Sequence, residues 1–166
     1  MFTSRTRARP SSNCCDVVLL YAYRDGHAMI RKRILLADDH TAMLEKVRAL
    51  LDRDYDVVGA VQDGNALICA ARELNPDVII TDITMPLMSG FAAMSQIRGL
   101  GVNSRLIFLT IHSEASYLKE AQRMRADGYV LKAYCYEQLP LAVSKVLIGE
   151  TYVSPELLST LFPSGG

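Results

Sequence analysis

The feature of this sequence that most constrains its fold is an alternation of short apolar runs with longer segments of helical periodicity. From Ile30 onward the two patterns alternate five times. Such alternation with short connections is typical of a parallel sheet covered by helices. A closed barrel of these units needs about 250 residues, so a chain of 166 residues is predicted to form an open α/β fold. We expect a doubly wound, five-stranded parallel sheet with helices on both faces. The predicted strands are 33–37, 55–61, 78–81, 105–110 and 129–132, and the predicted helices are 43–51, 63–74, 91–98, 114–125 and 137–148.

The most informative apolar run is Val78–Thr81, which leads into Asp82 and then into a loop marked by Pro86 and Gly90. A short continuous apolar run between turn signals is typical of a strand buried on both faces of a parallel sheet. Asp82 is therefore predicted at the carboxyl end of this strand, where open α/β sheets place their ligands. From this position alone, the carboxylate is either a cap for the following turn or a reactive group.

Composition limits the partners and the compartment of the protein. Lys plus Arg and Asp plus Glu number 18 each, so no overall field favours DNA or an anionic membrane. No apolar run approaches the roughly 20 residues that span a bilayer. The four cysteines form no C-x-x-C pair, which argues against a zinc site or a disulfide framework and favours a reducing cytoplasm.

The first 28 residues differ in composition from the rest of the chain. They begin with several arginines and a Pro-Ser-Ser stretch, and their apolar segment, residues 17–23, is too short for a secretory signal. We predict a poorly structured N-terminal extension over residues 1–28. A domain over residues 29–150 would follow, with Met29 as an alternative start of the protein.

Polar side chains stand at the ends of four of the five predicted strands. Three carboxylates in one crevice would repel each other unless a divalent cation lay among them, and an all-oxygen site favours Mg²⁺. Carboxylate, hydroxyl, ammonium and Mg²⁺ together are suited to phosphoryl transfer. The alternative is structural, because a lone aspartate at a strand end often caps a turn or a helix. The four features together favour a site. They are Asp38 and Asp39 after the first strand, Asp82 after the third, Thr110 at the end of the fourth and Lys132 at the end of the fifth.

These segments resemble the response-regulator receiver domain of bacterial two-component systems. The resemblance covers about residues 31–150 and implies a flavodoxin-like sheet of order 2-1-3-4-5. One departure is Ala133, where many members of the family have proline after the lysine. The matching segments are ILLADDH at 34–40, DITMPLMSG at 82–90, LT at 109–110 and GYVLK at 128–132.

The resemblance implies a role for each strand-end residue. Asp82 would be the phosphoacceptor. The metal site would consist of Asp82, of Asp39 as a direct Mg²⁺ ligand, and of Asp38 acting largely through water. The backbone carbonyl of Thr84 would complete the metal site. Thr110 would bind the phosphoryl group, and Lys132 would pair with it.

The C-terminal region is similar to the LuxR-type subgroup of this family. The similarity rests on Ala37 and His40 around the acid pair and on GETYVSP at 149–155. In that subgroup a linker leads to a DNA-binding helix-turn-helix. Here Ser154 and Pro155 are predicted to begin one short helix. Residues 151–166 are expected to be a short tail, the remnant of such a linker, without the helix-turn-helix and without specific DNA binding.

The leading hypothesis is a phosphoryl-accepting signalling switch. Its phosphoryl group would come from a sensor histidine kinase or a phosphotransfer protein, and a homodimer is left open. Such a protein is no ordinary enzyme, since it catalyses only its own phosphorylation and slow dephosphorylation. One alternative is a protein-binding module of the same fold that needs no phosphorylation. Another is a Mg²⁺-dependent phosphohydrolase, but that class carries a second acid two residues after its nucleophile, and here the position is Thr84.

The three histidines receive no role in this interpretation. His27, His40 and His112 share no ligand spacing, so no metal site is predicted for them. His112 lies two residues past Thr110. One interpretation is that it overhangs the phosphoryl group and tunes hydrolysis, as Thr84 would from the other side, but the favoured interpretation of each is an ordinary exposed residue.

Tyr129 is expected to take part in signalling. It precedes Lys132 by three residues, so the two side chains are predicted to point to opposite faces of the strand. Phosphorylation is expected to draw the Thr110 hydroxyl inward, so that the Tyr129 ring rotates into the vacated space. The resemblance implies the same coupling.

Overall fold

A parallel β-sheet forms the centre of the protein in a computed structural model, which describes residues 31–161. The expectations for residues 1–28, for Met29 as a start and for the end of the tail at 162–166 lie outside these residues. The strand order is β2-β1-β3-β4-β5-β6, so the predicted doubly wound sheet of order 2-1-3-4-5 is confirmed and a short sixth strand is added. The strands are β1 (Arg33–Ala37), β2 (Asp56–Val61), β3 (Val78–Thr81), β4 (Arg105–Thr110), β5 (Gly128–Leu131) and β6 (Tyr152–Val153).

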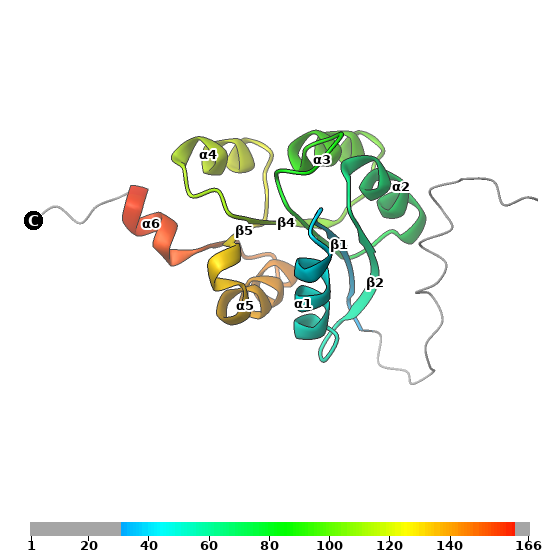
Figure 1. Cartoon of the computed structure of the whole chain (residues 1–166), viewed down its shortest axis with the longest axis horizontal. Helices are drawn as coiled ribbons and strands as arrows, with labels where there is room; N and C mark the ends of the chain where they lie inside the picture. The colour runs from blue at the N-terminus through cyan, green and yellow to red at the C-terminus, as the bar shows by residue number, and fades with distance from the viewer. Residues whose placement is uncertain (1–30, 162–166) are drawn as a thin grey trace, which may run out of the picture.

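Helices cover both faces of this sheet. Figure 1 views the sheet nearly on edge, with α2, α3 and α4 above it and α1 and α5 below it. The first and last of these five helices thus share one face and the three between them share the other, as in a doubly wound topology. The helices are α1 (Thr41–Leu51), α2 (Gly64–Leu74), α3 (Gly90–Gly99), α4 (Ala115–Arg123), α5 (Cys135–Leu147) and α6 (Pro155–Leu161), with a 3₁₀ turn, η2 (Lys132–Tyr134), before α5.

Two hydrophobic clusters, one on each face, hold the helices to the sheet. All four residues of β3 are buried, as expected for a strand with both faces covered. The cluster under α2, α3 and α4 contains Ile79 and Phe108, and the cluster under α1 and α5 contains Ile80 and Ile107. Neighbouring residues of each strand thus serve opposite cores, and buried Asp38, Asp82 and Thr110 stand at the carboxyl ends of strands.

Short polar side chains set the starts of the helices next to the site. Asp63 caps α2 by accepting a hydrogen bond from the backbone N–H of Ala66, and Ser89 caps α3 by accepting one from Ala92. At the other end of α2, Asn75 takes the left-handed conformation that commonly ends a helix.

Two details of the predicted elements were wrong. Helix α5 begins at Cys135 rather than near Glu137, so Pro140 lies in its second turn. Pro140 has no N–H for the carbonyl of Tyr136, but Tyr136 is 56% exposed, so water can hydrate that carbonyl. Strand β5 ends at Leu131, so Lys132 begins the η2 turn instead of ending the strand.

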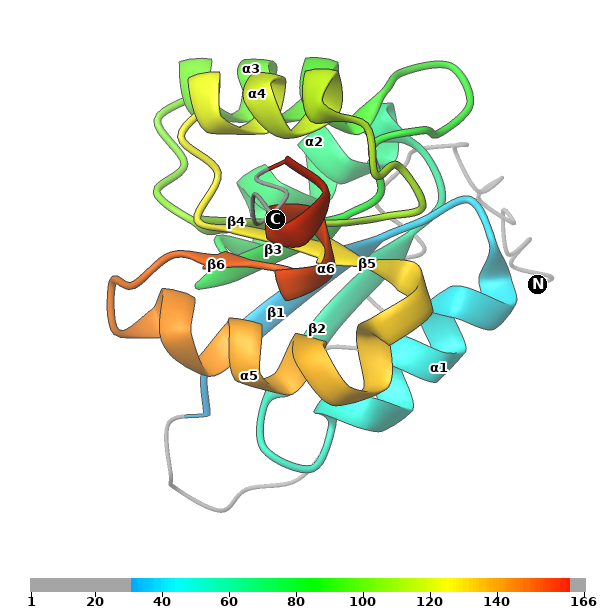
Figure 2. The same ribbon diagram turned by 90° about the vertical axis from the view of Figure 1, so that its left-hand side faces the viewer.

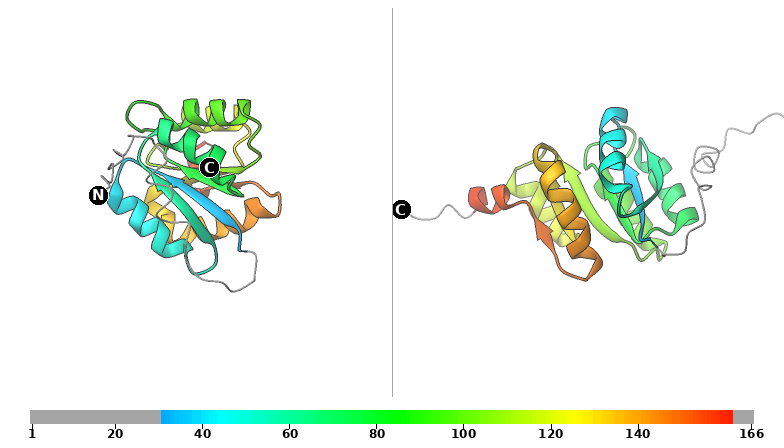
Figure 3. Two further views of the ribbon diagram at one scale, coloured as in Figure 1. Left: turned by 90° about the vertical axis from the view of Figure 1, so that its right-hand side faces the viewer. Right: turned by 90° about the horizontal axis from the view of Figure 1, so that it is seen from below.

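The sixth strand extends the sheet beyond β5. Tyr152 pairs with Gly128, and Val153 pairs with Tyr129, in parallel register. Figure 2 faces this edge of the sheet, with α6 in front of it, and the left panel of Figure 3 faces the opposite edge at β2. The helix predicted to begin at Ser154 and Pro155 is confirmed as α6, whereas β6 was not predicted.

Among the helices within residues 31–161, none is long and apolar enough to cross a membrane.

Candidate phosphoacceptor site

Lys132 joins two carboxylates at the carboxyl ends of neighbouring strands. Its Nζ lies 2.6 Å from Oδ2 of Asp38 and 2.6 Å from Oδ2 of Asp82. Asp38 follows β1 and Asp82 follows β3, and the two residues are only 4% and 5% exposed. The contact with Asp82 is a hydrogen bond, whereas Oδ2 of Asp38 has no hydrogen-bond partner among the described residues. The contact with Asp38 is therefore an ion pair without hydrogen-bond geometry.

The surroundings of Lys132 keep it charged. Burial lowers the pKa of its ammonium, but the close carboxylates of Asp38 and Asp82 outweigh burial, and the net pKa is raised. The other oxygen of Asp82, Oδ1, accepts a hydrogen bond from the backbone N–H of Ile83 at 2.6 Å. Asp82 thus has one oxygen held by its own loop and the other held by an ammonium.

The acid pair after β1 includes a third residue. Nδ1 of His40 lies 2.7 Å from Oδ1 of Asp39 and 3.3 Å from Oδ1 of Asp38. Possible ligand atoms of the three residues all lie within 4.8 Å of one another. The sequence predicted no metal role for His40, yet its ring nitrogen lies against both carboxylates of the predicted metal site.

Thr84, on the loop after β3, faces His112, on the loop after β4. Its Oγ1 shares a 2.7 Å hydrogen bond with Nε2 of His112. The side chain of His112 is only 18% exposed, so the expectation of an ordinary exposed residue was wrong. The reason is tertiary, because its partner lies 28 positions away in the sequence.

Thr110 and Tyr129 lie on neighbouring strands, two register positions apart, and are held differently. Thr110 is completely buried at the end of β4, and its hydroxyl accepts a hydrogen bond from the backbone N–H of His112 at 3.3 Å. The Tyr129 ring is 1% exposed, and its hydroxyl donates to the carbonyl of His112 at 2.9 Å. Burial is the main cause that raises the pKa of Tyr129, and the negative charge of Glu114 adds to it. The ring is already buried here, so the inward rotation expected from the sequence is not needed to bury it.

Gly90 packs directly under the phosphoacceptor position. A Cβ atom at Gly90 would lie 2.1 Å from the backbone oxygen of Asp82. The N–H of Gly90 also donates to the carbonyl of Ile83 at 2.8 Å. The first residue of α3 can therefore only be glycine if the loop after Asp82 is to keep its path.

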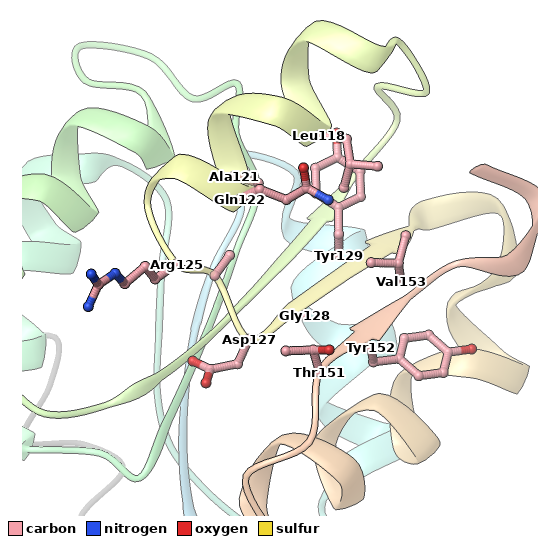
Figure 4. Close-up of a pocket in the computed structure, with 11 residues that line it drawn as sticks. Leu118, Ala121, Gln122, Arg125, Asp127, Gly128, Tyr129, Thr151, Tyr152 and Val153 are labelled. Atoms are coloured by element: carbon pink, nitrogen blue, oxygen red, sulfur yellow. The ribbon is translucent and has the colours of Figure 1, made fainter. Parts of the chain in front are cut away.

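A groove of about 410 Å³ lies between α4 and the outer strands β5 and β6. Figure 4 shows its lining, with side chains from α4 and from β5 and β6 around it. Tyr129 forms part of the wall, so the buried ring connects the site to an open surface. The groove is also lined by Leu118 and Gln122 from α4, by Arg125 and Asp127 before β5, and by Tyr152 and Val153 from β6.

Of the strand-end residues singled out in the sequence, some are in direct contact and others are connected only through a neighbouring residue. Asp38, Asp82 and Lys132 are in direct contact. Asp39 joins them through His40, and the N–H of Thr84 lies 3.4 Å from Oδ1 of Asp82. Sequence reasoning missed His40, His112 and Gly90. Of these only Gly90 left a local signal, as a glycine in the loop after the central strand.

This fold and this acidic pocket define a receiver domain. A model of the "response regulator receiver domain" family matches residues 34–144, and the chain belongs to that family of two-component signalling proteins. Its members are not conventional enzymes. The Asp38–Asp39–His40 cluster is of the kind at which receiver domains bind Mg²⁺.

Known relatives agree with this assignment. The oxygen regulatory protein NreC of Staphylococcus haemolyticus is 36% identical over 132 residues, covering 78% of this chain and 61% of NreC. The chain thus spans about three fifths of that relative's length. A two-component response regulator of the LuxR family from Aurantimonas sp. SI85-9A1 has a TM-score of 0.74 at 30% identity, covering 78% of this chain and 94% of that one.

RcsB of Salmonella enterica serovar Typhimurium is a third relative. Its isolated receiver domain, solved with the phosphomimetic BeF₃⁻, has a TM-score of 0.72 at 29% identity and covers 79% of this chain and 98% of that one. Another RcsB structure contains two dimers bound to two parallel DNAs, with a TM-score of 0.74 at 26% identity, covering 80% and 68% of the two chains.

Proposed function

We propose that this protein is a phosphoryl-accepting switch of a two-component phosphorelay, with Asp82 as the phosphoacceptor. The observation that carries the proposal is the pair of contacts from Lys132 to the buried carboxylates of Asp38 and Asp82. A buried aspartate at the carboxyl end of a central strand, with an ammonium 2.6 Å from one of its oxygens, is positioned to act as a nucleophile. The phosphoryl donor would be the phosphohistidine of a sensor histidine kinase or of a phosphotransfer protein.

In this mechanism a carboxylate oxygen of Asp82 bonds to phosphorus while the phosphorus–nitrogen bond of the donor breaks. The departing imidazole keeps the electron pair of that bond. Lys132 neutralises one phosphoryl oxygen, and the Thr110 hydroxyl donates to another. The chain's contribution is thus positioning and charge neutralisation, which dominate catalysis of phosphoryl transfer.

The residues present fit a divalent cation. Oδ2 of Asp38 is buried with Lys132 as its ion-pair partner but without a hydrogen bond among the described residues, and a metal-bound water would supply that bond. Asp39, Asp82 and the backbone carbonyl of Thr84 would hold Mg²⁺ with it, an oxygen set that suits a hard ion. When bound, Mg²⁺ would add positive charge beside the phosphoryl oxygens.

The signal would leave the site through Thr110 and Tyr129. The phosphoryl oxygens would draw the Thr110 hydroxyl toward Asp82, and the backbone of the next residues would follow. Since the Tyr129 hydroxyl is bonded to the carbonyl of His112, this movement changes how the ring is held at the wall of the groove between α4 and β6. That groove is the surface we expect an output partner to read.

Dimerisation is a further part of this proposal, because the relative RcsB forms dimers. Size-exclusion chromatography with light scattering, with and without beryllofluoride, tests it. A monomer under both conditions would exclude dimerisation as the output.

The direct test is phosphorylation by acetyl phosphate with Mg²⁺, followed by intact-mass measurement. Wild type should gain one phosphoryl group, and Asp82→Asn should gain none. Asp39→Asn should label slowly, with the rate restored in part by higher Mg²⁺. Equal labelling of wild type and Asp82→Asn would refute the assignment, and no labelling of wild type would favour a protein-binding module.

A further inference from the structure

Three side chains form a continuous connection from the loop after β3 to helix α4. Oγ1 of Thr84 and Nε2 of His112 are 2.7 Å apart. The imidazole ring of His112 stacks on the ring of Tyr117, with a centroid distance of 3.9 Å and an interplanar angle of 10°. Tyr117 belongs to the first turn of α4. We call this connection the Thr84–His112–Tyr117 clasp.

The far end of the clasp is anchored in the core. The Tyr117 ring stacks on Phe91 of α3, with centroids 6.4 Å apart and 21° between the planes. Phe91 in turn meets Phe108 of β4 edge-on, with centroids 4.8 Å apart. The position of the Tyr117 ring is therefore set by the hydrophobic core and not by solvent, and the ring provides a firm support for His112.

The near end of the clasp belongs to a residue that is otherwise loosely held. Thr84 is exposed. Its other described hydrogen bond runs from its N–H to Oδ1 of Asp82 at 3.4 Å, which is long for a bond of this type. The side-chain bond to His112 is thus the shortest contact described for Thr84, and it acts on the residue whose carbonyl faces the metal in the proposed function.

We propose that His112 and Tyr117 are positioning residues for the metal-ligating loop of the phosphoacceptor site. The inference rests on the proposed function, in which the Thr84 carbonyl is a Mg²⁺ ligand. His112 holds Thr84 in place, and Tyr117 holds His112 against it. Because the two ends of the clasp are coupled, a partner that shifts the first turn of α4 changes the affinity for Mg²⁺, and Mg²⁺ changes the affinity for that partner by the same factor.

The experiment is a Mg²⁺ titration of the full chain, followed by NMR of the backbone amides around Asp82 without any phosphoryl donor. The variants are Tyr117→Leu, which removes the stacked ring, His112→Ala, which removes the bond to Thr84, and Tyr117→Phe, which keeps the ring. Tyr136→Leu, an exposed tyrosine on α5, is the matched control. Urea unfolding of each variant reports whether any change reflects a general loss of stability.

We expect Tyr117→Leu and His112→Ala each to weaken Mg²⁺ binding about three- to tenfold, the range for loss of one hydrogen bond. The double variant should be no weaker than His112→Ala alone, since both changes break one connection. Tyr117→Phe and Tyr136→Leu should bind like wild type. Unchanged affinity in both disruptive variants would overturn the inference, as would an equal loss in Tyr117→Phe and Tyr117→Leu.

Failure of the inference can be told apart from failure of the proposed function. If wild type is not phosphorylated at Asp82 but the Mg²⁺ affinities follow the expected order, the positioning role stands and the phosphoacceptor assignment falls. If Asp82 is phosphorylated and the affinities do not differ, the phosphoacceptor stands and the clasp has no positioning role. A wild-type protein that binds no Mg²⁺ would overturn the clasp inference outright.

Discussion

Substitution of Gly90 by alanine should slow the phosphorylation of Asp82, although it replaces no residue that takes part in the chemistry. The new Cβ atom would lie 2.1 Å from the backbone oxygen of Asp82, and also 3.1 Å from its carbonyl carbon and 3.2 Å from Oγ1 of Thr81. Cβ contacts below 3.0 Å are essentially never observed. The obstructing atom is a backbone oxygen, so no flexible side chain can move aside.

Relief of this contact requires a shift of about 1 Å in either α3 or the peptide of Asp82, and overpacking of this kind costs about 1–3 kcal/mol of folding stability. A misplacement of that size at a reacting group can lower the rate about 100-fold. We therefore expect Gly90→Ala to be moderately destabilised and to be phosphorylated at Asp82 far more slowly than wild type. Intact-mass time courses with acetyl phosphate measure the rate, and urea unfolding measures the stability.

Gly99 provides the matched control, because it lies in the same helix and an added Cβ there would meet no atom within 4 Å. Gly99→Ala should be phosphorylated at the wild-type rate and should change little in stability, because Gly99 is the last residue of α3 and the helix propensity of alanine counts mainly in a helix interior. If Gly90→Ala were labelled as fast as Gly99→Ala, the close approach of α3 to Asp82 would not control the position of the carboxylate.

Three more predictions concern stability. Burial raises the pKa of Asp77, but hydrogen bonds from β1 and nearby basic charges outweigh burial and lower it below its usual 3.8. Its stabilisation is thus present above that pH and lost as the pH falls through the lower folded value, so wild type should lose more stability on acidification than Asp77→Asn in urea titrations. Ser154→Ala should cost about 1–3 kcal/mol, because it leaves the buried N–H of Leu131 without its acceptor, whereas the exposed Ser144→Ala should be nearly neutral by the same unfolding assay. A chain that starts at Met29 should melt within a few degrees of the full chain by calorimetry, since residues 1–28 are mixed in composition and their polar start cannot build a core, and a large drop in melting temperature would show that this segment packs on the domain.

The strand and helix pattern was predictable because each central strand is short, apolar and bounded by turn residues. Val78–Thr81 is the clearest case, since its four residues are all buried. The site followed from the same reasoning, because parallel strands bring their carboxyl ends to one edge. That rule alone brings Asp38, Asp82 and Lys132 together.

The features that escaped prediction depend on contacts between distant segments. Tyr152 and Val153 form β6 because the N–H of Tyr152 donates to the carbonyl of Asp127 and buried Ser154 bonds to Gln138 and Leu131. Two residues are too few to show a period of any kind. The partnership of Thr84 with His112 likewise has no local signal, because it depends on where two loops meet above the sheet.

The shortness of β6 also affects how copies of this protein meet one another. An unpaired edge strand presents a row of N–H and C=O groups on which a foreign strand can add, and such edges promote aggregation. Beside β5 that row is occupied by Tyr152 and Val153, and the chain then turns through buried Ser154 into Pro155, which has no N–H to offer. The new margin is only two residues long, so it offers a second chain very few hydrogen bonds. Truncation before Tyr152 would remove β6 and leave β5 as an unpaired edge strand. The shortened protein should then self-associate at concentrations at which the longer chain does not.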